Sequence, residues 1–576
     1  MREIIRRTAT ETHEWAPELP VLVKHIYAVR GVNDSANLDK GLSQLLPYHA
    51  LEGIATAVDL LIETLSAQQR ILVVGDFDAD GATSSALAVL ALRAMGALSV
   101  NYLVPNRFEY GYGLTPEIVM LAKEQAPELL ITVDNGISSH EGVVLAKSFG
   151  MRVLVTDHHL PGDDLPEADV IINPNLRTDQ FQSKCLAGVG VVFYLMLALR
   201  TALKEKGWFN DRHLPVPNMA QFLDLVALGT VADVVPLDRN NRILVHHGVQ
   251  RIRAGLGRKG IHALLRIAGK SFPQLTTGDL GFAVGPRLNA AGRLDDMSIG
   301  IQCLLSDDEE EALKLATQLD GLNEERRQIE SEMQAQAFEQ LKTLAWDKLA
   351  ASPNGLCLFN PEWHQGVIGI LASRIKDKLH RPVVVFAKGS ETEMKGSARS
   401  ISGIHIRDVF QAINAKYPHL IYKFGGHAMA AGLTIPRTQF TAFQAAFVEQ
   451  INEKLDPAVL KQVLYSDGEL TETALTLSLA ELLRDLEPWG QGFPEPLFDG
   501  RFHLIDQRLV GGKHLKMKVT PVGGVRLIDA IAFNVDVAAW PNHRCEKVHI
   551  AYRLDINDFN SRRQLQLIIA DIKECV

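Results

Sequence analysis

Three stretches of this chain have the pattern of buried β-strands that end in acidic residues, and this feature limits the fold most strongly. The apolar runs at 71–74, 129–133 and 152–156 lead directly into GDFDADG, DNG and DHH. Continuous β-branched and apolar runs of this length are typical of strands buried on both faces of a parallel sheet. Because helix-like segments alternate with them up to about residue 235, the sequence predicts a doubly wound α/β domain.

The acidic residues after these strands are expected to meet in one crevice. In an open parallel sheet, ligands bind beyond the carboxyl ends of the strands. The residues delivered there are Asp76, Asp78, Asp80, Asp134, Asp157, His158 and His159. So many carboxylates repel one another unless cations neutralise them. Oxygen ligands with one or two imidazoles suit Mn²⁺ or Mg²⁺ better than Zn²⁺. The pattern therefore predicts a metal-dependent phosphoester site.

Each of these features has an ordinary structural explanation when it stands alone. The chain holds a second tandem histidine pair, His246–His247, which has no acid beside it and is expected to be structural. A single aspartate at a strand end is commonly a turn or helix cap. The prediction of a metal site depends on three strands ending in this way, one of them with two histidines.

Composition excludes several classes of protein. The chain has 576 residues, enough for three or four domains, and a net charge of −9. Its five cysteines lie far apart without a CxxC pair, which argues against a disulfide framework or a zinc site. The first residues lack an apolar signal core, and the longest apolar stretch, 189–199, is too short to span a bilayer. We expect a cytoplasmic protein without membrane segments.

Two basic runs suggest a polyanionic substrate despite the negative net charge. Between Arg239 and Arg293 there are ten Lys and Arg residues and one acid, and between Arg501 and Arg526 six against one. A solvated basic face is the alternative explanation for either run. The GKS at 269–271 lacks the glycine that a phosphate-binding loop needs five residues earlier, so ATP is not expected as a ligand.

The acidic motifs resemble those of a known family. GDFDADG, VDNG, TDHH and the later GTVADVVPL look like the four motifs of the DHH phosphoesterases. The resemblance covers nearly all of the chain from about residue 30, and the later segments are similar to the single-strand-specific 5′→3′ exonucleases of that family. It implies an enzyme that releases mononucleotides from single-stranded DNA in repair and recombination. The implied cofactor is a pair of Mn²⁺ or Mg²⁺ ions.

The resemblance also implies roles for individual residues. The expected metal ligands are Asp78, Asp80, Asp134, His158 and Asp233. His159 is expected to hydrogen-bond the scissile phosphate, while Asp76 and Asp157 either bind metal directly or orient other ligands. The wider superfamily often has a histidine where this chain has Val74. That departure predicts weaker binding of one ion.

Substrate contacts are expected in four glycine-rich segments. The candidates that the resemblance implies are Arg107, Tyr112, Arg287, Asn289, Arg293, Ser397, Arg399, Gly426 and His427. Arginines can bind phosphate oxygens with two hydrogen bonds, tyrosine can stack on an unpaired base, and glycines expose backbone N–H groups. Glycine turns with half-buried aromatic residues, or a tight helix junction, are the structural alternatives.

We predict five segments in an α/β protein with an additional β-barrel. They are an N-terminal segment at 1–35, the DHH parallel-sheet domain at 36–300, a connecting helix at 301–350, a smaller DHH-associated α/β domain at 351–455 and an OB-fold at 465–576. Ser306 is the expected cap of the connecting helix, and Thr83, Ser84 or Ser85 that of the helix after GDFDADG. The GSARS segment, which holds Ser397 and Arg399, is expected in a loop flanked by glycines. The KFGGH segment, which holds Gly426 and His427, is expected to bind a phosphate through its exposed backbone N–H groups and the histidine.

Two other functions fit parts of the pattern. The chain could be a DHH phosphodiesterase for short oligonucleotides or cyclic dinucleotides, although such substrates need no extended binding track. It could also be a catalytically retired replication scaffold, which the presence of every candidate ligand opposes. The family resemblance further implies single-strand-binding protein and a helicase as partners beside single-stranded DNA.

Overall fold

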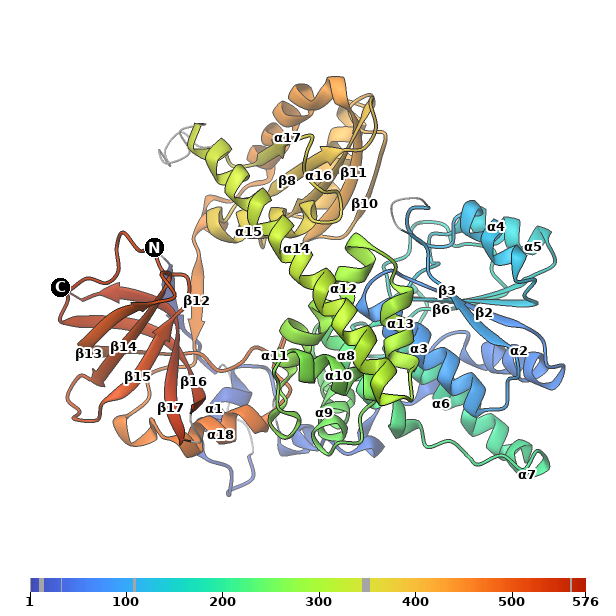
Figure 1. Ribbon diagram of the computed structural model, residues 1–576, viewed down its shortest axis with the longest axis horizontal. Coiled ribbons are helices and arrows are strands. Elements are labelled where there is room, and N and C mark those ends of the chain that lie inside the picture. Colours follow the sequence, from blue (N-terminus) through green and yellow to red (C-terminus); the bar gives the residue numbers. More distant parts are fainter. Residues whose placement is uncertain are drawn as a thin grey trace. The chain divides into compact units, whose positions relative to one another are not determined.

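The computed structural model describes residues 2–9, 15–32, 34–106, 110–343, 353–559 and 562–575 (Figure 1). The chain forms two compact units. The larger unit comprises Arg6–Asn323 and Tyr465–Val576, and the smaller one Glu324–Leu464 together with the residues up to Ile5.

The larger unit contains the predicted parallel sheet. Its strands are β2 (Ile71–Gly75), β3 (Val100–Leu103), β4 (Leu129–Val133), β5 (Arg152–Thr156) and β6 (Val170–Ile172), in the order β3-β2-β4-β5-β6. All neighbouring strands are parallel. Strands β2 and β4 are buried along their whole length, as expected from their unbroken apolar runs. The α/β prediction is confirmed.

Helices cover both faces of this sheet. They are α2 (Ile54–Ser66), α3 (Ala79–Ala94), α4 (Pro116–Glu124), α5 (His140–Ser148) and α6 (Gly188–Glu205). Alternate side chains of β2 point to opposite sides, so Ile71 and Val73 share a core with α2, α3 and α6. Leu72 and Val74 pack with α4 and α5 on the other side. The carboxyl ends of the strands therefore stay accessible between two helical layers.

The remainder of this part is helical. Its α-helices are α1 (Val21–Ala28), α7 (Trp208–Asp211), α8 (Leu223–Ala232), α9 (Arg239–Arg253), α10 (Lys259–Ile267), α11 (Thr277–Asp279), α12 (Gly285–Leu294) and α13 (Ser298–Leu305). A π-helical turn covers Leu280–Val284, and short 3₁₀ turns cover Ser35–Leu38, Leu42–Gln44, Tyr48–Ala50, Met219–Phe222 and Phe272–Gln274. The second histidine pair lies within α9, where His247 Nε2 is 2.7 Å from the Lys40 carbonyl oxygen, in keeping with a structural role.

A closed barrel completes the larger unit. It consists of β13 (Phe498–Val510), β14 (His514–Pro521), β15 (Ile528–Ala532), β16 (Lys547–Phe559) and β17 (Arg562–Glu574), in the order β13-β14-β15-β17-β16. Only the β15–β17 pair is parallel. Helix α18 (Leu477–Leu486) contributes Leu483 to the barrel core, and α1 contributes Ile26. The predicted C-terminal barrel is confirmed, and it shares packing with the N-terminal part of the chain.

The smaller unit holds a second sheet in the order β10-β11-β9-β8-β7. The strands are β7 (Leu356–Phe359), β8 (Val383–Lys388), β9 (Glu393–Arg399), β10 (Lys423–Gly426) and β11 (Ala430–Pro436). The helices are α15 (Ile368–Leu379), α16 (Ile406–Lys416) and α17 (Phe440–Lys454), and 3₁₀ turns cover Arg437–Gln439 and Pro457–Leu460. Strands β1 (Glu3–Arg6) and β12 (Val463–Ser466) form a two-stranded ribbon, and a last 3₁₀ turn at Glu472–Ala474 precedes α18.

The long helix α14 (Glu309–Thr343) confirms the predicted connecting helix (Figure 1). Its predicted cap was wrong. Asp308 Oδ1 accepts the hydrogen bond of Glu311 N at 2.8 Å, while Ser306 Oγ accepts from Asp308 N. The boundaries predicted for the five segments stay predictions.

Two further local predictions, the cap of α3 and the GSARS loop, were wrong. Asp78, and not Thr83, Ser84 or Ser85, caps α3, because the helix already begins inside the acidic motif. The GSARS segment lies mostly in strand β9, and KFGG forms strand β10 of the hairpin that continues into β11. A Cβ atom at Gly396 would lie 2.5 Å from Phe386 Cε1 on β8 and 2.6 Å from Leu433 Cδ2 on β11, so β9 fits between these strands because that residue is glycine.

Among the described residues, no single helix is both long and apolar enough to cross a membrane. One bent pair, Leu42–Ala50 with Ile54–Ser66, meets that test by length and composition.

Candidate metal centre

The first acidic motif forms a tight turn between β2 and α3. Asp78 Oδ1 accepts hydrogen bonds from Asp80 N at 2.9 Å and from Gly81 N at 3.0 Å. A Cβ atom at Gly81 would lie 2.4 Å from the Asp76 carbonyl oxygen, so only glycine permits this turn. The helix start favours negative charge, which offsets part of the repulsion among the three carboxylates.

Asp80 is buried at the start of a second helix. Its Oδ2 accepts a hydrogen bond from Gly188 N at 2.6 Å, and its Oδ1 accepts one from Val189 N at 2.9 Å. Both donors belong to the first turn of α6. Burial, with the nearby charge of Asp78, raises the pKa of Asp80 to about 7. The carboxylate is thus fixed in orientation, and each oxygen keeps a lone pair for a cation.

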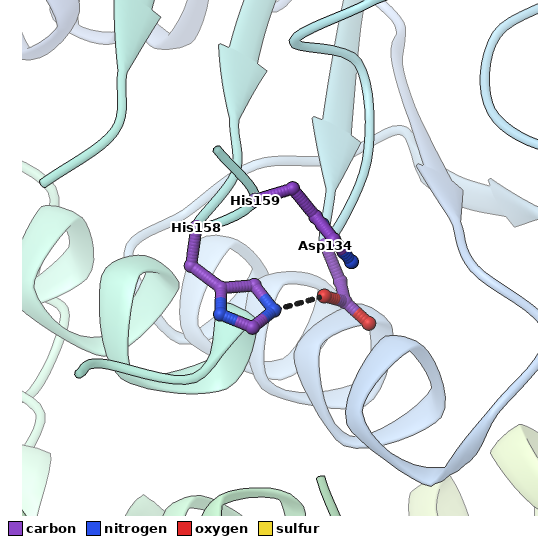
Figure 2. A group of neighbouring side chains, drawn as sticks. All are labelled: Asp134, His158 and His159. Carbon is purple, nitrogen blue, oxygen red and sulfur yellow. Dashed lines mark ion pairs between the residues drawn. The ribbon is translucent and has the colours of Figure 1, made fainter. Parts of the chain in front are cut away.

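Asp134 follows β4 in a left-handed conformation, with φ +61°. Aspartate tolerates this region better than most residues. Its Oδ1 lies 3.1 Å from His158 Nε2 (Figure 2). A Cβ atom at Gly188 would lie 2.6 Å from the Asp134 Cβ, so α6 can approach only because that residue is glycine. Burial and the surrounding carboxylates raise the pKa of Asp134 well above its usual value.

Three carboxylates from different elements converge on one ring nitrogen. His158 Nε2 lies 3.1 Å from Asp134 Oδ1, 3.6 Å from Asp233 Oδ2 and 3.9 Å from Asp80 Oδ2. Asp233 is the C-cap of α8, and burial and its acidic neighbours raise its pKa well above the usual value. The adjacent Val234 has φ +62°. A β-branched residue in this region stores strain of about 1–3 kcal/mol, so surrounding contacts must hold it.

Asp157 has a different environment from the other acids. Its Oδ1 accepts hydrogen bonds from His158 N at 2.7 Å and His159 N at 3.1 Å and lies 2.7 Å from His159 Nδ1. Its Oδ2 accepts one from Ile137 N at 2.9 Å. Burial alone would raise the pKa of Asp157, but these contacts, led by that with His159, outweigh burial and lower it to about 2.

The donor set fits hard divalent cations. Ligand atoms lie within 4.8 Å of one another in three groups: Asp76 with Asp78 and Asp134, Asp80 with His158 and Asp233, and Asp134 with His158 and His159 (Figure 2). Asp134 and His158 each belong to two groups. Carboxylate oxygens with imidazole nitrogens are the donors that Mn²⁺ and Mg²⁺ accept, and shared residues are what a pair of neighbouring ions needs.

Comparisons with known proteins agree with this geometry. The DHH family N-terminal domain matches residues 70–230, the DHHA1 domain 352–453 and the RecJ OB domain 466–571. The single-stranded-DNA-specific exonuclease RecJ of Salmonella typhimurium is 56% identical over 575 residues, which are 99% of each chain. This chain belongs to the RecJ family.

Two further RecJ proteins extend the likeness. RecJ of Escherichia coli is 55% identical over 570 residues, again 99% of both chains. The crystal structure of RecJ in complex with Mn²⁺ from Thermus thermophilus is 31% identical, with a TM-score of 0.78, and the match covers 96% of this chain and 76% of that one.

Of the substrate contacts expected in this RecJ-family chain, Tyr112 and Asn289 lie beside the acidic cluster. Tyr112 Oη lies 3.3 Å from the His159 ring nitrogens and donates to the Asp134 carbonyl oxygen at 3.3 Å. Asn289 Oδ1 accepts from Ala79 N at 2.8 Å, at the start of α3. A Cβ atom at Gly292 would lie 1.7 Å from the Phe77 carbonyl oxygen, so α12 packs directly on the first motif.

The arginines expected near the site have varied surroundings. Arg287 is buried, donates from Nη1 to the Ala283 carbonyl oxygen at 2.6 Å and forms an ion pair with Asp320 at 2.8 Å. Arg293 lies in the last turn of α12, and Arg107 lies outside the described residues.

The remaining expected contacts gather within the smaller unit. Arg399 Nη1 donates to Ser397 Oγ at 3.1 Å, and both residues belong to β9. The neighbouring strand β11 pairs Ala430 with Arg399 and continues to β10, where Gly426 has φ +134°. His427 N donates to the Ala430 carbonyl oxygen at 2.7 Å in the hairpin turn.

Sequence reasoning missed the residues that hold the DHH backbone. Asn175 Nδ2 donates to the His158 carbonyl oxygen at 2.6 Å, and Asn173 Nδ2 donates to that of His159 at 2.8 Å. Both follow β6, a fourth strand that ends in polar residues at the same edge of the sheet. The sequence NPN at 173–175 after an apolar run was the signal that would have found them.

Proposed function

We propose that this RecJ-family chain is a metal-dependent exonuclease specific for single-stranded DNA. It releases mononucleotides in the 5′→3′ direction and acts in repair and recombination. The observation that carries the proposal is the convergence of Asp80, Asp134 and Asp233 on His158 Nε2, in a chain 56% identical to a protein named for this activity.

The acidic cluster would hold two Mn²⁺ or Mg²⁺ ions. Asp78, Asp80, Asp134, His158 and Asp233 are the proposed ligands, with Asp76 beside them. When bound, the ions supply an activated water for in-line attack and neutralise charge on the attacking and leaving oxygens. The chain fixes the ligands in advance, since α6 holds Asp80 and the asparagines after β6 hold the DHH backbone.

Asp157 and His159 are proposed to act together in binding the scissile phosphate. The hydrogen bonds of the Asp157 carboxylate go to the DHH backbone, the His159 ring and Ile137 N, which favours an orienting role over metal binding. Burial lowers the pKa of His159, but the hydrogen bond with Asp157 and nearby negative charge outweigh it and raise that pKa to about 9. His159 would donate a hydrogen bond to a nonbridging oxygen of the scissile phosphate.

The outer face of the barrel is proposed to bind single-stranded DNA. Along β14, Leu515, Met517 and Val519 point inward, so Lys516 and Lys518 point outward. Lys516 lies directly opposite Arg508 on β13. Like charges in this position repel, and a phosphate between them would relieve the repulsion.

Aromatic side chains and the other basic residues of this face fit the same role. Phe533 is 53% exposed, and its ring centroid lies 5.2 Å from that of His514, where unpaired bases can stack. Arg501, Arg508, Lys513, Lys516 and Lys518 form no ion pair within the part of the chain that the structure describes.

The first basic run does not support a DNA path. Six of its ten cations form ion pairs within the larger unit: Arg242 with Glu487, Arg253 with Asp485, Arg258 with Asp307, Arg266 with Glu309, Lys270 with Asp279 and Arg287 with Asp320. The run mainly neutralises acids from later parts of the sequence. In the smaller unit, Ser397 and Arg399 lie on β9 and Gly426 on β10, the two strands that flank β11, and His427 follows in the hairpin turn. These four residues are proposed to bind a substrate phosphate.

The protein is further proposed to act with two protein partners. Single-strand-binding protein and a helicase would present and extend single strands for digestion, in the cytoplasm. Copurification or binding assays with each protein test this part separately from catalysis.

A metal titration against hydrolysis of a 5′-labelled single strand tests the function. We expect no activity in chelator and saturable activation by Mn²⁺ or Mg²⁺, with labelled mononucleotide as the first product. Blunt duplex and circular single-stranded DNA of the same sequence should be poor substrates, because the site needs an unpaired end. Equal rates on circular and linear strands, or activity in chelator, would overturn the proposal.

A further inference from the structure

The linker between α18 and the barrel contains a closed turn, Trp489–Phe493, called the linker turn below. Gly490 N donates to the Phe493 carbonyl oxygen at 3.0 Å, and Phe493 N donates to that of Gly490 at 3.2 Å. The Trp489 and Phe493 rings stack, with centroids 5.4 Å apart. The turn therefore has a defined shape in spite of its two glycines.

The tip of the linker turn contacts the loop that follows Asp233. Leu237 N donates to the Gln491 carbonyl oxygen at 2.7 Å. A Cβ atom at Gly492 would lie 3.1 Å from Pro236 Cβ, and one at Gly490 would lie 2.7 Å from Leu237 Cδ1. The two backbones approach so closely because both positions are glycine.

The linker turn is itself held by residues of α9 and α11. Thr277 Oγ1 donates to the Trp489 carbonyl oxygen at 2.6 Å. Phe493 is buried in the core that also contains the sheet helices, and the Arg242 guanidinium lies 4.1 Å from its ring centroid. The turn is thus a rigid support placed against residues 236 and 237.

The supported loop needs such a contact. Val234, the residue after Asp233, has φ +62°, which a valine rarely adopts. Such a conformation persists only where surrounding contacts fix the chain on both sides. On the N-terminal side, Asp233 N closes α8 by donating to the Gly229 carbonyl oxygen at 2.9 Å. On the C-terminal side, the linker turn meets Pro236 and Leu237, and Asn241 Nδ2 donates to the Pro236 carbonyl oxygen at 2.9 Å.

We propose that the linker turn positions Asp233 for metal binding. The inference rests on the proposed function, in which Asp233 is a ligand. Residues 489–493 are positioning residues that keep the loop after Asp233 strained and so hold its carboxylate near His158. The C-terminal part of the chain consequently contributes to the metal centre as well as to DNA binding.

The test uses glycine substitutions in the full-length protein, with Mn²⁺ binding measured by calorimetry in the absence of DNA. Gly492→Ala should weaken one Mn²⁺ by about tenfold, the lower range for residues that orient a ligand. Gly150→Ala is the matched control, because Gly150 has φ +80° against +71° at Gly492 and no atom lies within 4 Å of its added Cβ. The control should bind Mn²⁺ like the unmodified protein while showing a similar loss of thermal stability.

A suppressor separates positioning from general destabilisation. Val234→Gly removes the strain, because glycine adopts a positive φ without steric cost. In the Gly492→Ala background it should restore most of the Mn²⁺ affinity, whereas a stabilising substitution far from the loop should not. If Gly492→Ala does not fold, Gly490→Ala replaces it, since its Cβ would contact the flexible end of Leu237.

Asp233→Asn separates a failure of the proposed metal site from a failure of the inference about the linker turn. If Asp233→Asn retains full Mn²⁺ affinity, Asp233 is not a ligand and the proposed site is wrong. If Asp233→Asn weakens Mn²⁺ but Gly492→Ala and Gly490→Ala do not, the proposed function stands and the inference about the linker turn is overturned. A loss in Gly150→Ala as large as that in Gly492→Ala would overturn the inference as well.

Discussion

Asp157 Oδ1 lies 2.7 Å from His159 Nδ1, so the first and last residues of the DHH motif form a pair. The same carboxylate accepts the backbone N–H groups of His158 and His159. Asp157 therefore fixes the position of the turn and the orientation of the second imidazole, while His158 faces the other acids. One strand end thus supplies a candidate ligand and a separate phosphate donor.

We predict that Asp157→Asn reduces turnover by 100-fold or more and destabilises the fold by about 1–3 kcal/mol. An amide cannot accept all four hydrogen bonds that the carboxylate accepts, and buried donors that lose their acceptor cost this much. Single-turnover kinetics and urea unfolding measure the two effects. His159→Gln is the control, which should lose similar activity but little stability, because the backbone N–H groups keep their acceptor. Normal turnover in Asp157→Asn would contradict the orienting role.

We predict that Asp134→Asn abolishes hydrolysis, leaves binding to single-stranded DNA largely intact and stabilises the metal-free protein. Asp134 is buried among carboxylates that repel it, and asparagine tolerates its φ of +61°. Thermal melts in chelator should show a higher melting temperature for the variant. Added Mn²⁺ should raise the melting temperature of the unmodified protein much more than that of the variant, since binding to the native state stabilises it. A variant that turns over normally at saturating Mn²⁺ would show that Asp134 is not a ligand.

Much of this site could be predicted from the sequence because each strand and the acidic residue after it form a pattern within a few consecutive residues. An apolar run of five residues followed by an aspartate shows both the strand and the edge at which the side chain lies. Three such runs, with β2, β4 and β5 adjacent in the sheet, were enough to bring Asp76, Asp134 and Asp157 together.

Other features depend on contacts between distant parts of the chain and left no local pattern. Asp80 accepts hydrogen bonds from the backbone N–H groups of Gly188 and Val189, more than 100 residues later. Neither segment has a sequence feature that predicts its contact with the other. Arg287 pairs with Asp320. An arginine among glycines has the same local sequence whether it meets a phosphate or a carboxylate of the same chain.

We predict that stability contributed by Asp499 is lost between about pH 4 and pH 2. Burial would raise the pKa of Asp499, but hydrogen bonds from Arg6, Ser466 and His549 outweigh burial and lower it to about 2. A carboxylate with a lowered pKa stabilises the fold above its unfolded pKa of about 3.9. That stability disappears as the pH falls through the folded value. Its size is about 2 kcal/mol.

Asp499→Asn tests this by urea unfolding across the acid range. The variant should be less stable than the unmodified protein by about 2 kcal/mol at neutral pH, and the difference should shrink below about pH 4. Asp163→Asn is a control, because Asp163 is exposed and its ion pair with Arg177 lies at the surface. A difference between Asp499→Asn and the unmodified protein that stays constant from pH 7 to pH 2 would contradict the assignment.

The last prediction concerns the basic face of the barrel. The triple variant Arg508→Ala, Lys516→Ala and Lys518→Ala should bind long single strands more weakly and with a shallower salt dependence. Each phosphate contact on a single strand contributes about −0.7 to the slope of log K against log salt, so three lost contacts should change it by about 2. These side chains point away from the barrel core, and the fold should therefore survive the change.

Salt titrations of DNA binding in chelator give the slope. The control variant Lys204→Ala with Lys206→Ala removes two exposed charges from the end of α6. Turnover on very short oligonucleotides should change little, because none of the three residues is among the candidate metal ligands. An unchanged slope and affinity in the triple variant would show that this face does not bind DNA.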